Sequence, residues 1–284
     1  MPRCCKTRQG AVALACGIWL VTASPARGDV LYVKAQATGP NDGTSWADAY
    51  TDLQDALTTG RAGDEIWVAA GIYRPSERTA PEDPFSVTFR LKSGVEIYGG
   101  FAGTETDRGQ RDPATNVTIL SGDLAGDDAE VLDPAFLLGE PTRADNCYHV
   151  VTGSSADETA VLDGFTITAG MANGENVNDV NGGGMFNVVT GGVLRRGIPF
   201  TPRSPARPTL INCTFSGNAA LGHGGGLYNR GGILILTNCV FRGNSADGIF
   251  PVSIGRADAA GGGGGLYSAG RVSGTTLANS HRHG

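Results

Sequence analysis

The chain has 284 residues, and 44 of them are glycine, about twice the usual ~7%. The glycines cluster instead of recurring at every third position, which excludes collagen, and the charged fraction of only 18% excludes a long coiled coil. The formal net charge of −6 is unevenly distributed: residues 29–164 carry 9 basic and 24 acidic groups, whereas residues 165–284 carry 9 basic and 4 acidic groups. The acidic half and the scattered arginines of the other half argue against a nucleic-acid partner.

The N-terminus has the pattern of an export signal. Three basic residues within the first eight precede an apolar run at 11–23, and small residues with a proline follow it. This pattern predicts a signal peptide over residues 1–28, and therefore an exported protein. The apolar run is too short to span a bilayer, so we expect no transmembrane span in the mature chain.

Residues 29–75 are predicted to form an N-terminal cap. Short apolar segments bounded by turn residues predict strands at 30–33 and 66–69. Between them, apolar residues recur at helical spacing over 46–57, and Ser45 precedes them as a candidate N-cap. We therefore expect a helix over 46–57 that covers one end of the fold.

The segment 76–161 contains further short strands and no helical periodicity. The strands are expected at 87–91, 95–98, 117–120 and 148–151. Because no helical segment separates them, the pattern excludes an alternating α/β fold and favours an all-β fold.

The second half of the chain contains an internal repeat. Residues 210–218 read LINCTFSGN and residues 236–244 read LTNCVFRGN, so that Cys213 of the first copy recurs as Cys239 in the second. Residues 162–170 are a degenerate earlier copy, and Leu277–Ser280 is expected to open a later one in which Leu277 corresponds to Leu236. A second motif, a glycine triplet followed by an apolar and an aromatic residue, alternates with the first at 182–187, 224–229 and 263–268.

The length variation between copies falls at two fixed points, which is typical of stacked coils with loops at their corners. Coils this short without a helix predict a parallel β-solenoid whose strands stack at ~4.8 Å. Alternation places Cys213 and Phe215 inward, each stacked on its counterpart in the next copy. Asn218 and Asn244 fall at a corner where their amides can form a ladder, and the glycine triplets suit corners that need positive φ or close approach of coils.

These residues resemble the right-handed parallel β-helix proteins of the pectate-lyase-like fold. The paired Gly-Gly-x-Leu and Phe-x-x-Asn motifs are also similar to the repeats of chlamydial polymorphic outer membrane proteins, and they stand here at 225–227 with 215–218 and at 264–266 with 241–244. Residues 98–123 are similar to the first coils of large secreted bacterial β-helix proteins.

The resemblance implies an all-β fold, a right-handed parallel β-helix with an N-terminal capping α-helix. We expect irregular initial coils over 76–161 and repeat coils over 162–284. The chain ends soon after Leu277–Ser280, so we expect a truncated array whose open C-terminal strand edges allow self-association.

One loop is a candidate metal site. Asp123, Asp127 and Asp128, followed by Glu130, lie close together after a predicted strand. Carboxylate oxygens are the ligands that calcium prefers, so these residues are candidate calcium ligands. The alternative interpretation is a solvated acidic turn.

Two classes of function remain. The favoured one is a structural or adhesin-like surface protein that binds polysaccharide or a cell-surface glycan. The alternative implied by the resemblance is a calcium-dependent polysaccharide lyase, or a glycoside hydrolase, that acts on acidic polysaccharide. A lyase needs a base beside calcium-holding acids, and a hydrolase needs a pair of carboxyl groups.

The residues favour a non-enzymatic role, and we assign no catalytic and no cofactor-binding residue. Acids of the repeat half lie in insertions, and Arg230 and Arg242 have the pattern of ordinary solvated arginines. His149 and His223 have no accompanying nucleophile, so we expect packing or surface roles for both. The insertion at 188–208, with four arginines and four prolines, is either a basic contact arm for anionic glycans or a disordered surface loop.

Three cysteines remain after the expected signal peptide, namely Cys147, Cys213 and Cys239. An odd number does not predict a small disulfide-stapled domain. Cys213 and Cys239 lie one coil apart, within reach of a disulfide, but we favour a buried stack of thiols.

Overall fold

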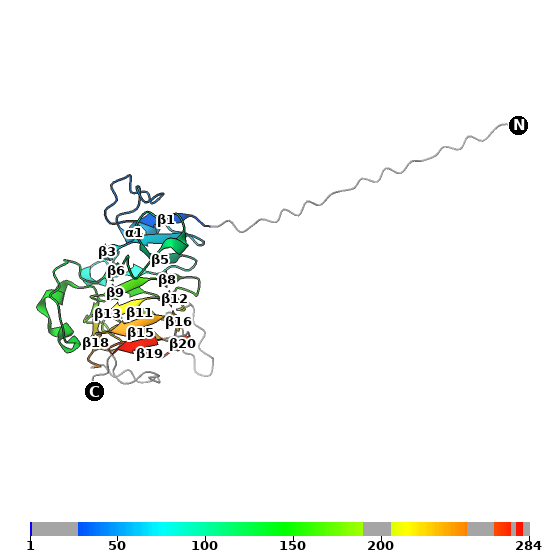
Figure 1. Cartoon of the computed structure of the whole chain (residues 1–284). Coiled ribbons are helices and arrows are strands. Elements are labelled where there is room, and N and C mark those ends of the chain that lie inside the picture. The colour runs from blue at the N-terminus through cyan, green and yellow to red at the C-terminus, as the bar shows by residue number, and fades with distance from the viewer. Residues whose placement is uncertain (2–27, 190–205, 249–263, 274–276, 281–284) are drawn as a thin grey trace.

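The computed structural model describes residue 1 and residues 28–189, 206–248, 264–273 and 277–280. Most of the expected signal peptide and most of the insertion at 188–208 lie outside the described residues. The described fold is predominantly β, and its strands stack in chain order from the blue N-terminal end to the red C-terminal end (Figure 1). The strands within each sheet run parallel, an arrangement that is compatible with a β-solenoid.

The described strands form four sheets. The seven-stranded sheet has the order β1 (Val30–Val33), β2 (Glu65–Ala69), β5 (Glu96–Phe101), β8 (Val161–Asp163), β12 (Thr209–Ile211), β16 (Ile233–Thr237) and β20 (Arg271–Ser273). The six-stranded sheet has the order β3 (Gly71–Tyr73), β6 (Thr118–Ser121), β9 (Phe165–Thr168), β13 (Thr214–Ser216), β17 (Cys239–Arg242) and β21 (Leu277–Ser280). The five-stranded sheet has the order β4 (Phe89–Arg90), β7 (Val151–Thr152), β11 (Met185–Val188), β15 (Leu227–Arg230) and β19 (Leu266–Ser268), and the three-stranded sheet the order β10 (Met171–Ala172), β14 (Ala219–Ala220) and β18 (Ser245–Ala246).

The register of the strands confirms the period of the repeat. Leu210 lies opposite Leu236 and Phe215 opposite Phe241, so equivalent positions of the two copies pair with each other. The degenerate copy also pairs as expected, because Ile167 lies opposite Phe215, as the alignment of 162–170 with 210–218 predicts. Each copy of the repeat therefore contributes one strand to each of two adjacent sheets.

The expected register of the last copy is wrong by three positions. Leu277 lies opposite Cys239 instead of opposite Leu236. The pairing of the strands just before them explains this register. Ile233 of β16 lies opposite Arg271 of β20, and the two residues are separated by the same number of positions as Cys239 and Leu277. The backbone pairing of β16 with β20 thus sets the register of β21. It outweighs the similarity of residue types that aligned Leu277 with Leu236.

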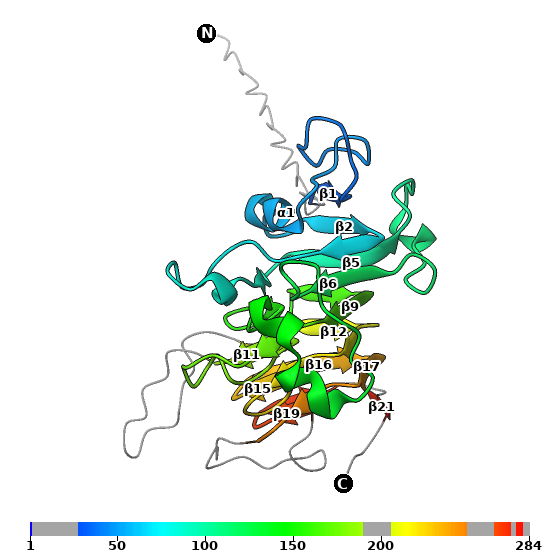
Figure 2. The same ribbon diagram turned by 90° about the vertical axis from the view of Figure 1, so that its left-hand side faces the viewer.

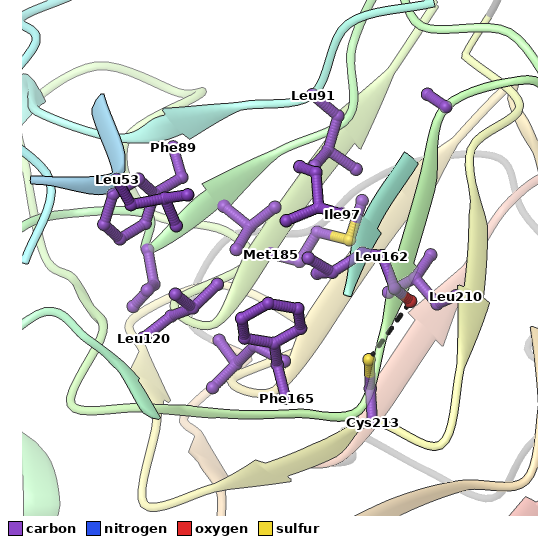
Figure 3. Packing of buried hydrophobic residues seen from close by; sticks show 14 of the residues in the cluster. Leu53, Phe89, Leu91, Ile97, Leu120, Leu162, Phe165, Met185, Leu210 and Cys213 are labelled. Carbon is purple, nitrogen blue, oxygen red and sulfur yellow. Dashed lines mark hydrogen bonds between the residues drawn. The ribbon is translucent and has the colours of Figure 1, made fainter. Parts of the chain in front are cut away.

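The interior is a column of apolar side chains that runs through the stack (Figure 3). Phe165, Leu210 and Phe215 are fully buried, and the rings of Phe215 and Phe241 stack with centroids 4.9 Å apart and planes inclined by 6°. This stacking confirms the inward direction predicted for Phe215. Burial of each such side chain contributes about 1.5–3 kcal/mol to folding.

The helix near the N-terminus is shorter than predicted. Helix α1 covers Leu53–Thr59, and its N-cap is Asp52, whose carboxylate accepts a hydrogen bond from the Gln54 backbone N–H at 2.8 Å. Tyr50 instead adopts an extended pairing with β1, in which its N–H donates to the Tyr32 carbonyl at 2.9 Å. A helix that began at Trp46 would break this pairing, so α1 begins after it. The buried apolar residues of α1, Leu53, Ala56 and Leu57, join the central column of apolar side chains.

The glycine triplets serve both purposes expected of them. Gly224 has φ of +63°, in the left-handed region that favours glycine. At Gly225 a Cβ atom would collide with the backbone carbonyl oxygen of Ser245 in the next coil. The triplet therefore lets the chain turn at one residue and lets the coils approach each other at the next.

An arm, residues 124–146, leaves the stack and runs along its outside (Figure 2). It contains the short 3-10 helices η3 (Pro134–Gly139) and η4 (Pro141–Asp145), in addition to η1 (Pro84–Ser86) and η2 (Arg108–Gln110) elsewhere in the chain. Leu137 of the arm packs against Met171 and Ala219 of the three-stranded sheet. The arm thus covers that sheet over several coils.

Candidate functional site

An open, shallow pocket of about 620 Å³ lies at the corner between the seven-stranded and six-stranded sheets. One wall is the loop 102–116, which connects β5 to β6, and the other is the corner that follows β12 and β16. Its lining residues are Arg108, Gly109, Arg111, Asp112, Pro113, Ala114, Asn212 and Asn238. We call it the corner pocket.

The asparagines of the corner pocket form an exposed ladder, which we call the outer ladder. The Asn238 Nδ2 group donates to Asn212 Oδ1 at 2.7 Å, and Asn212 Nδ2 donates to Asp163 Oδ1 at 2.9 Å. Asn212 and Asn238 have φ of +51° and +52°, a region that asparagine tolerates better than most residues. This backbone requirement explains why asparagine precedes cysteine in both copies of the repeat.

Arg111 anchors the loop to the outer ladder. Its Nη2 atom lies 2.5 Å from Asp163 Oδ2, and its Nη1 atom donates to the Gly99 carbonyl oxygen at 3.1 Å. Both side chains of this ion pair are largely buried, with 15% of Arg111 and 7% of Asp163 exposed. The guanidinium group is therefore held in place.

Arg108 is held by a second group of acids. Its Nη1 atom lies 3.0 Å from Glu65 Oε1 and 3.5 Å from Glu96 Oε2, and it donates to the Tyr98 hydroxyl oxygen at 2.8 Å. The Arg108 guanidinium also lies 4.5 Å above the centre of the Tyr98 ring, a cation–π contact. Burial, and next the hydrogen bond to Glu96, raises the pKa of Tyr98, so this phenol remains a hydrogen-bond donor.

The loop itself is fixed by its own carboxylates. Glu105 accepts hydrogen bonds from the backbone N–H groups of Ala102, Gly103 and Thr104. Burial acts to raise the pKa of Glu105, but these hydrogen bonds outweigh it and lower that pKa. The side-chain hydrogen bond from Thr115 likewise lowers the pKa of exposed Asp112, which remains ionised at the mouth of the pocket.

A second ladder of asparagines is buried at another corner, and we call it the inner ladder. Asn218 Nδ2 donates to Asn244 Oδ1 at 2.9 Å, as the repeat predicted, and also to the Ile167 carbonyl oxygen at 3.0 Å. The Gly170 backbone N–H donates to Asn218 Oδ1 at 3.0 Å. Asn218 is fully buried and Asn244 partly buried, so this ladder satisfies backbone groups and Asn218 is inaccessible to a ligand.

Sequence reasoning missed a third ladder. Asn187 Nδ2 donates to Asn229 Oδ1 at 2.8 Å, and Asn229 Nδ2 donates to the Ser268 hydroxyl at 3.0 Å. All three residues stand two positions after the first apolar residue of the glycine-triplet motif. This shared position is the signal in the sequence from which the ladder could have been predicted. Since Asn187 and Asn229 are fully buried, this ladder is also structural.

The acidic loop differs from the predicted ligand set. Asp123, Asp127 and Asp145 bring carboxylate oxygens within 4.8 Å of one another, whereas Asp128 turns away and lies 3.1 Å from Arg143 Nη1. Asp145 was missed because it lies at the end of η4, and only the path of the arm returns it to the loop. Two of the three acids already accept backbone hydrogen bonds, Asp123 from Gly126 and Asp145 from Ala125. Calcium binding here stays a prediction.

The Asp128–Arg143 pair has a structural role in the arm. Arg143 is 4% exposed, and its Nη2 atom donates to the Gly217 carbonyl oxygen at 2.9 Å. Burial raises the pKa of Asp128 and lowers that of Arg143, because each charged group has lost solvent. The pair therefore fixes the arm to the repeat coils, and the Asp128 carboxylate is directed to Arg143 and not to Asp123 and Asp127.

The two histidines pack, as expected. His149 stacks on Phe186 with ring centroids 4.7 Å apart, and its Nδ1 atom lies 3.0 Å from the Gly182 carbonyl oxygen, which requires the proton on Nδ1. Burial lowers the pKa of His149 to about 4, so the ring is neutral at pH 7. His223 stacks on Tyr267 at 4.7 Å.

The remaining candidates are buried thiols and exposed arginines. Cys147, Cys213 and Cys239 are free, buried thiols, and burial raises the pKa of Cys213. The Cys213 Sγ atom lies 3.4 Å from the Leu162 carbonyl oxygen (Figure 3). Arg230 and Arg242 are exposed, as their pattern predicted.

Comparison of the chain with protein-family models, with curated proteins and with solved structures found no match. None of the helices in the described part of the chain is long and apolar enough to cross a membrane.

Proposed function

We propose that this protein is a secreted or cell-surface right-handed parallel β-helix, capped by α1, that binds glycans through the corner pocket and has a structural or adhesin-like role. The single observation that carries the proposal is the exposed outer ladder, which presents one amide per coil beside a pocket of about 620 Å³. Amides both donate and accept hydrogen bonds, which matches the hydroxyl groups of sugars.

Three further features support this role. The pattern of residues 1–28 favours export. The loop that overhangs the pocket is held by the ion pair of Arg111 with Asp163, so the pocket is largely preformed. Parallel stacking places equivalent polar groups in a row, which suits a polymer with a repeating structure.

A glycan array probed with the full chain tests the proposal. The expected result is binding of at least one polysaccharide without formation of an unsaturated or reducing product. Ala114→Trp should abolish this binding because the indole would occupy the corner pocket, whereas Ala129→Trp, at an exposed position on the arm, should leave it unchanged. Turnover of the polysaccharide, or equal binding by both variants, would contradict the proposal.

A further inference from the structure

The corner pocket contains guanidinium groups, yet its surroundings are not cationic. Its two cations are Arg108 and Arg111. Four carboxylates lie beside or within hydrogen-bonding reach of the same cluster, namely Glu65, Glu96, Asp112 and Asp163. Two positive charges against four negative charges leave the cluster with a formal excess of two negative charges.

Both guanidinium groups already bind carboxylates. An anionic ligand that recruited Arg111 would have to separate it from Asp163, whose side chain is 7% exposed. The Asp163 carboxylate would then be left buried without its cation, which is strongly unfavourable. Arg108 is more exposed, at 42%, but a ligand that recruited it would have to draw it away from Glu65, whose side chain is 13% exposed.

Besides Arg108, whose partly exposed guanidinium is already paired with Glu65 and Glu96, the accessible groups of the corner pocket are two amides and the Asp112 carboxylate. Asn212 and Asn238 are exposed, and their mutual hydrogen bond uses only part of the donor and acceptor capacity of each amide. Asp112 presents a carboxylate, which accepts hydrogen bonds from hydroxyl groups and repels anions. The amides follow one another at the coil spacing of ~4.8 Å.

We infer that the corner pocket binds a segment of an uncharged polysaccharide and discriminates against uronate and sulfate groups. This inference rests on the proposed function and specifies its ligand class. The hydroxyl groups of the ligand bond to the outer ladder and to Asp112, and the acidic surroundings exclude polyanions. It is the opposite of the acidic substrate that the sequence resemblance implies for a lyase.

Titration of the full chain with four soluble polysaccharides separates the possibilities. Galactomannan and β-glucan are the neutral probes, and polygalacturonate and heparin are the acidic ones. At least one neutral probe should bind about tenfold more tightly than either acidic probe. Its affinity should change by less than about twofold between low and high salt, because no ion pair with the ligand forms.

A double variant ties this binding to the outer ladder. Asn212→Gly with Asn238→Gly removes both amides, and glycine accepts the positive φ at these positions. Asp163 loses the hydrogen bond from Asn212 but keeps its ion pair with Arg111, so the fold should be preserved. The double variant should weaken neutral-glycan binding by about tenfold. The matched control, Asn173→Gly with Asn178→Gly, alters two exposed asparagines of another loop and should bind as the unmodified chain does.

The outcomes separate this inference from the proposed function. Tighter, salt-sensitive binding of polygalacturonate or heparin would overturn the inference and leave glycan binding intact. Neutral-glycan binding that the double variant does not weaken would overturn the assignment to the outer ladder. Failure of all four probes to bind, together with an empty glycan array, would overturn both.

Discussion

The outer and inner ladders use the same residue type within the same repeat, but their environments differ. Asn212 and Asn238 of the outer ladder are exposed beside a pocket, whereas Asn218 of the inner ladder is fully buried and bonded to backbone groups. A repeated asparagine is therefore structural at one corner and accessible to a ligand at the other. The difference shows that regular repetition does not by itself identify a binding surface, because burial decides which groups remain accessible.

The largest expected effect is at the apolar column next to the inner ladder. Phe215→Ala removes a fully buried ring that stacks on Phe241, so it should lower the free energy of unfolding by about 3–5 kcal/mol. Chemical denaturation monitored by circular dichroism measures this change. Ser216→Ala, at the outward-facing neighbour, should change it by less than about 0.5 kcal/mol, and equal effects would contradict the assigned strand alternation.

A similar loss of stability is expected where the arm meets the corner that holds the inner ladder. Arg143→Met leaves the Asp128 carboxylate buried without its cation and should cost about 3 kcal/mol. Adding Asp128→Asn should recover part of the loss, because the unpaired charge is then removed. If the single and double variants unfold at the same denaturant concentration, the ion pair does not anchor the arm.

The two ladders themselves should respond differently. Asn218→Ala leaves the Gly170 N–H and the Ile167 carbonyl group without their partner and should cost about 2–3 kcal/mol. Asn238→Gly, which suits the positive φ and lies in solvent, should cost less than about 0.5 kcal/mol. Thermal unfolding of both variants measures the contrast, and equal losses would show that the outer ladder is also structural.

The smallest effect depends on pH and concerns His149, which lies against the carbonyl group of Gly182 in the first glycine triplet. His149 is neutral in the fold, and its pKa of about 4 lies below the value near 6.5 of an unfolded chain. The unfolded state therefore binds more protons between these values, so stability falls as the pH falls through this range.

Between about pH 7 and about pH 5 the loss should be about 1–2 kcal/mol. His149→Phe keeps a ring against Phe186 and removes the titration, so its stability should vary less with pH over that range. Denaturant midpoints of both proteins at several pH values measure the difference. Identical pH profiles would show that His149 is not the group responsible.

Much of the fold followed from patterns within the repeat. The period of the coils, the inward direction of Phe215 and the ladder of Asn218 with Asn244 were all predicted from alternation and spacing. The start of α1 was not, because an apolar helical pattern over 46–57 competes with the backbone pairing of Tyr50 to β1. The helix propensity of residues 46–57 gives no information about this pairing, because the partner strand β1 lies outside that segment.

The candidate site was much less accessible to sequence reasoning. Arg108 and Arg111 lie far before Asn212 in the chain, and only the stacking of coils brings them to one pocket. Likewise, Asp128 faces Arg143 whereas Asp145 joins Asp123 and Asp127, an exchange that depends on the path of the arm. The spacing of residues along the chain does not show which of these contacts form, because each contact is set by the register of strands that are distant in sequence.

The amino-acid sequence by itself determined the repeating coil, the inward apolar positions and the residues that turn at each corner, because these depend on local alternation and on backbone conformations that few residues adopt. Only the tertiary structure decided which asparagines remain exposed, how the last coil is registered and which charges face one another at the corner pocket. Those properties depend on stacking between segments that are separated by at least one full coil in the sequence. The burial and the pairing of a residue are then set by the neighbouring coils and not by its own segment.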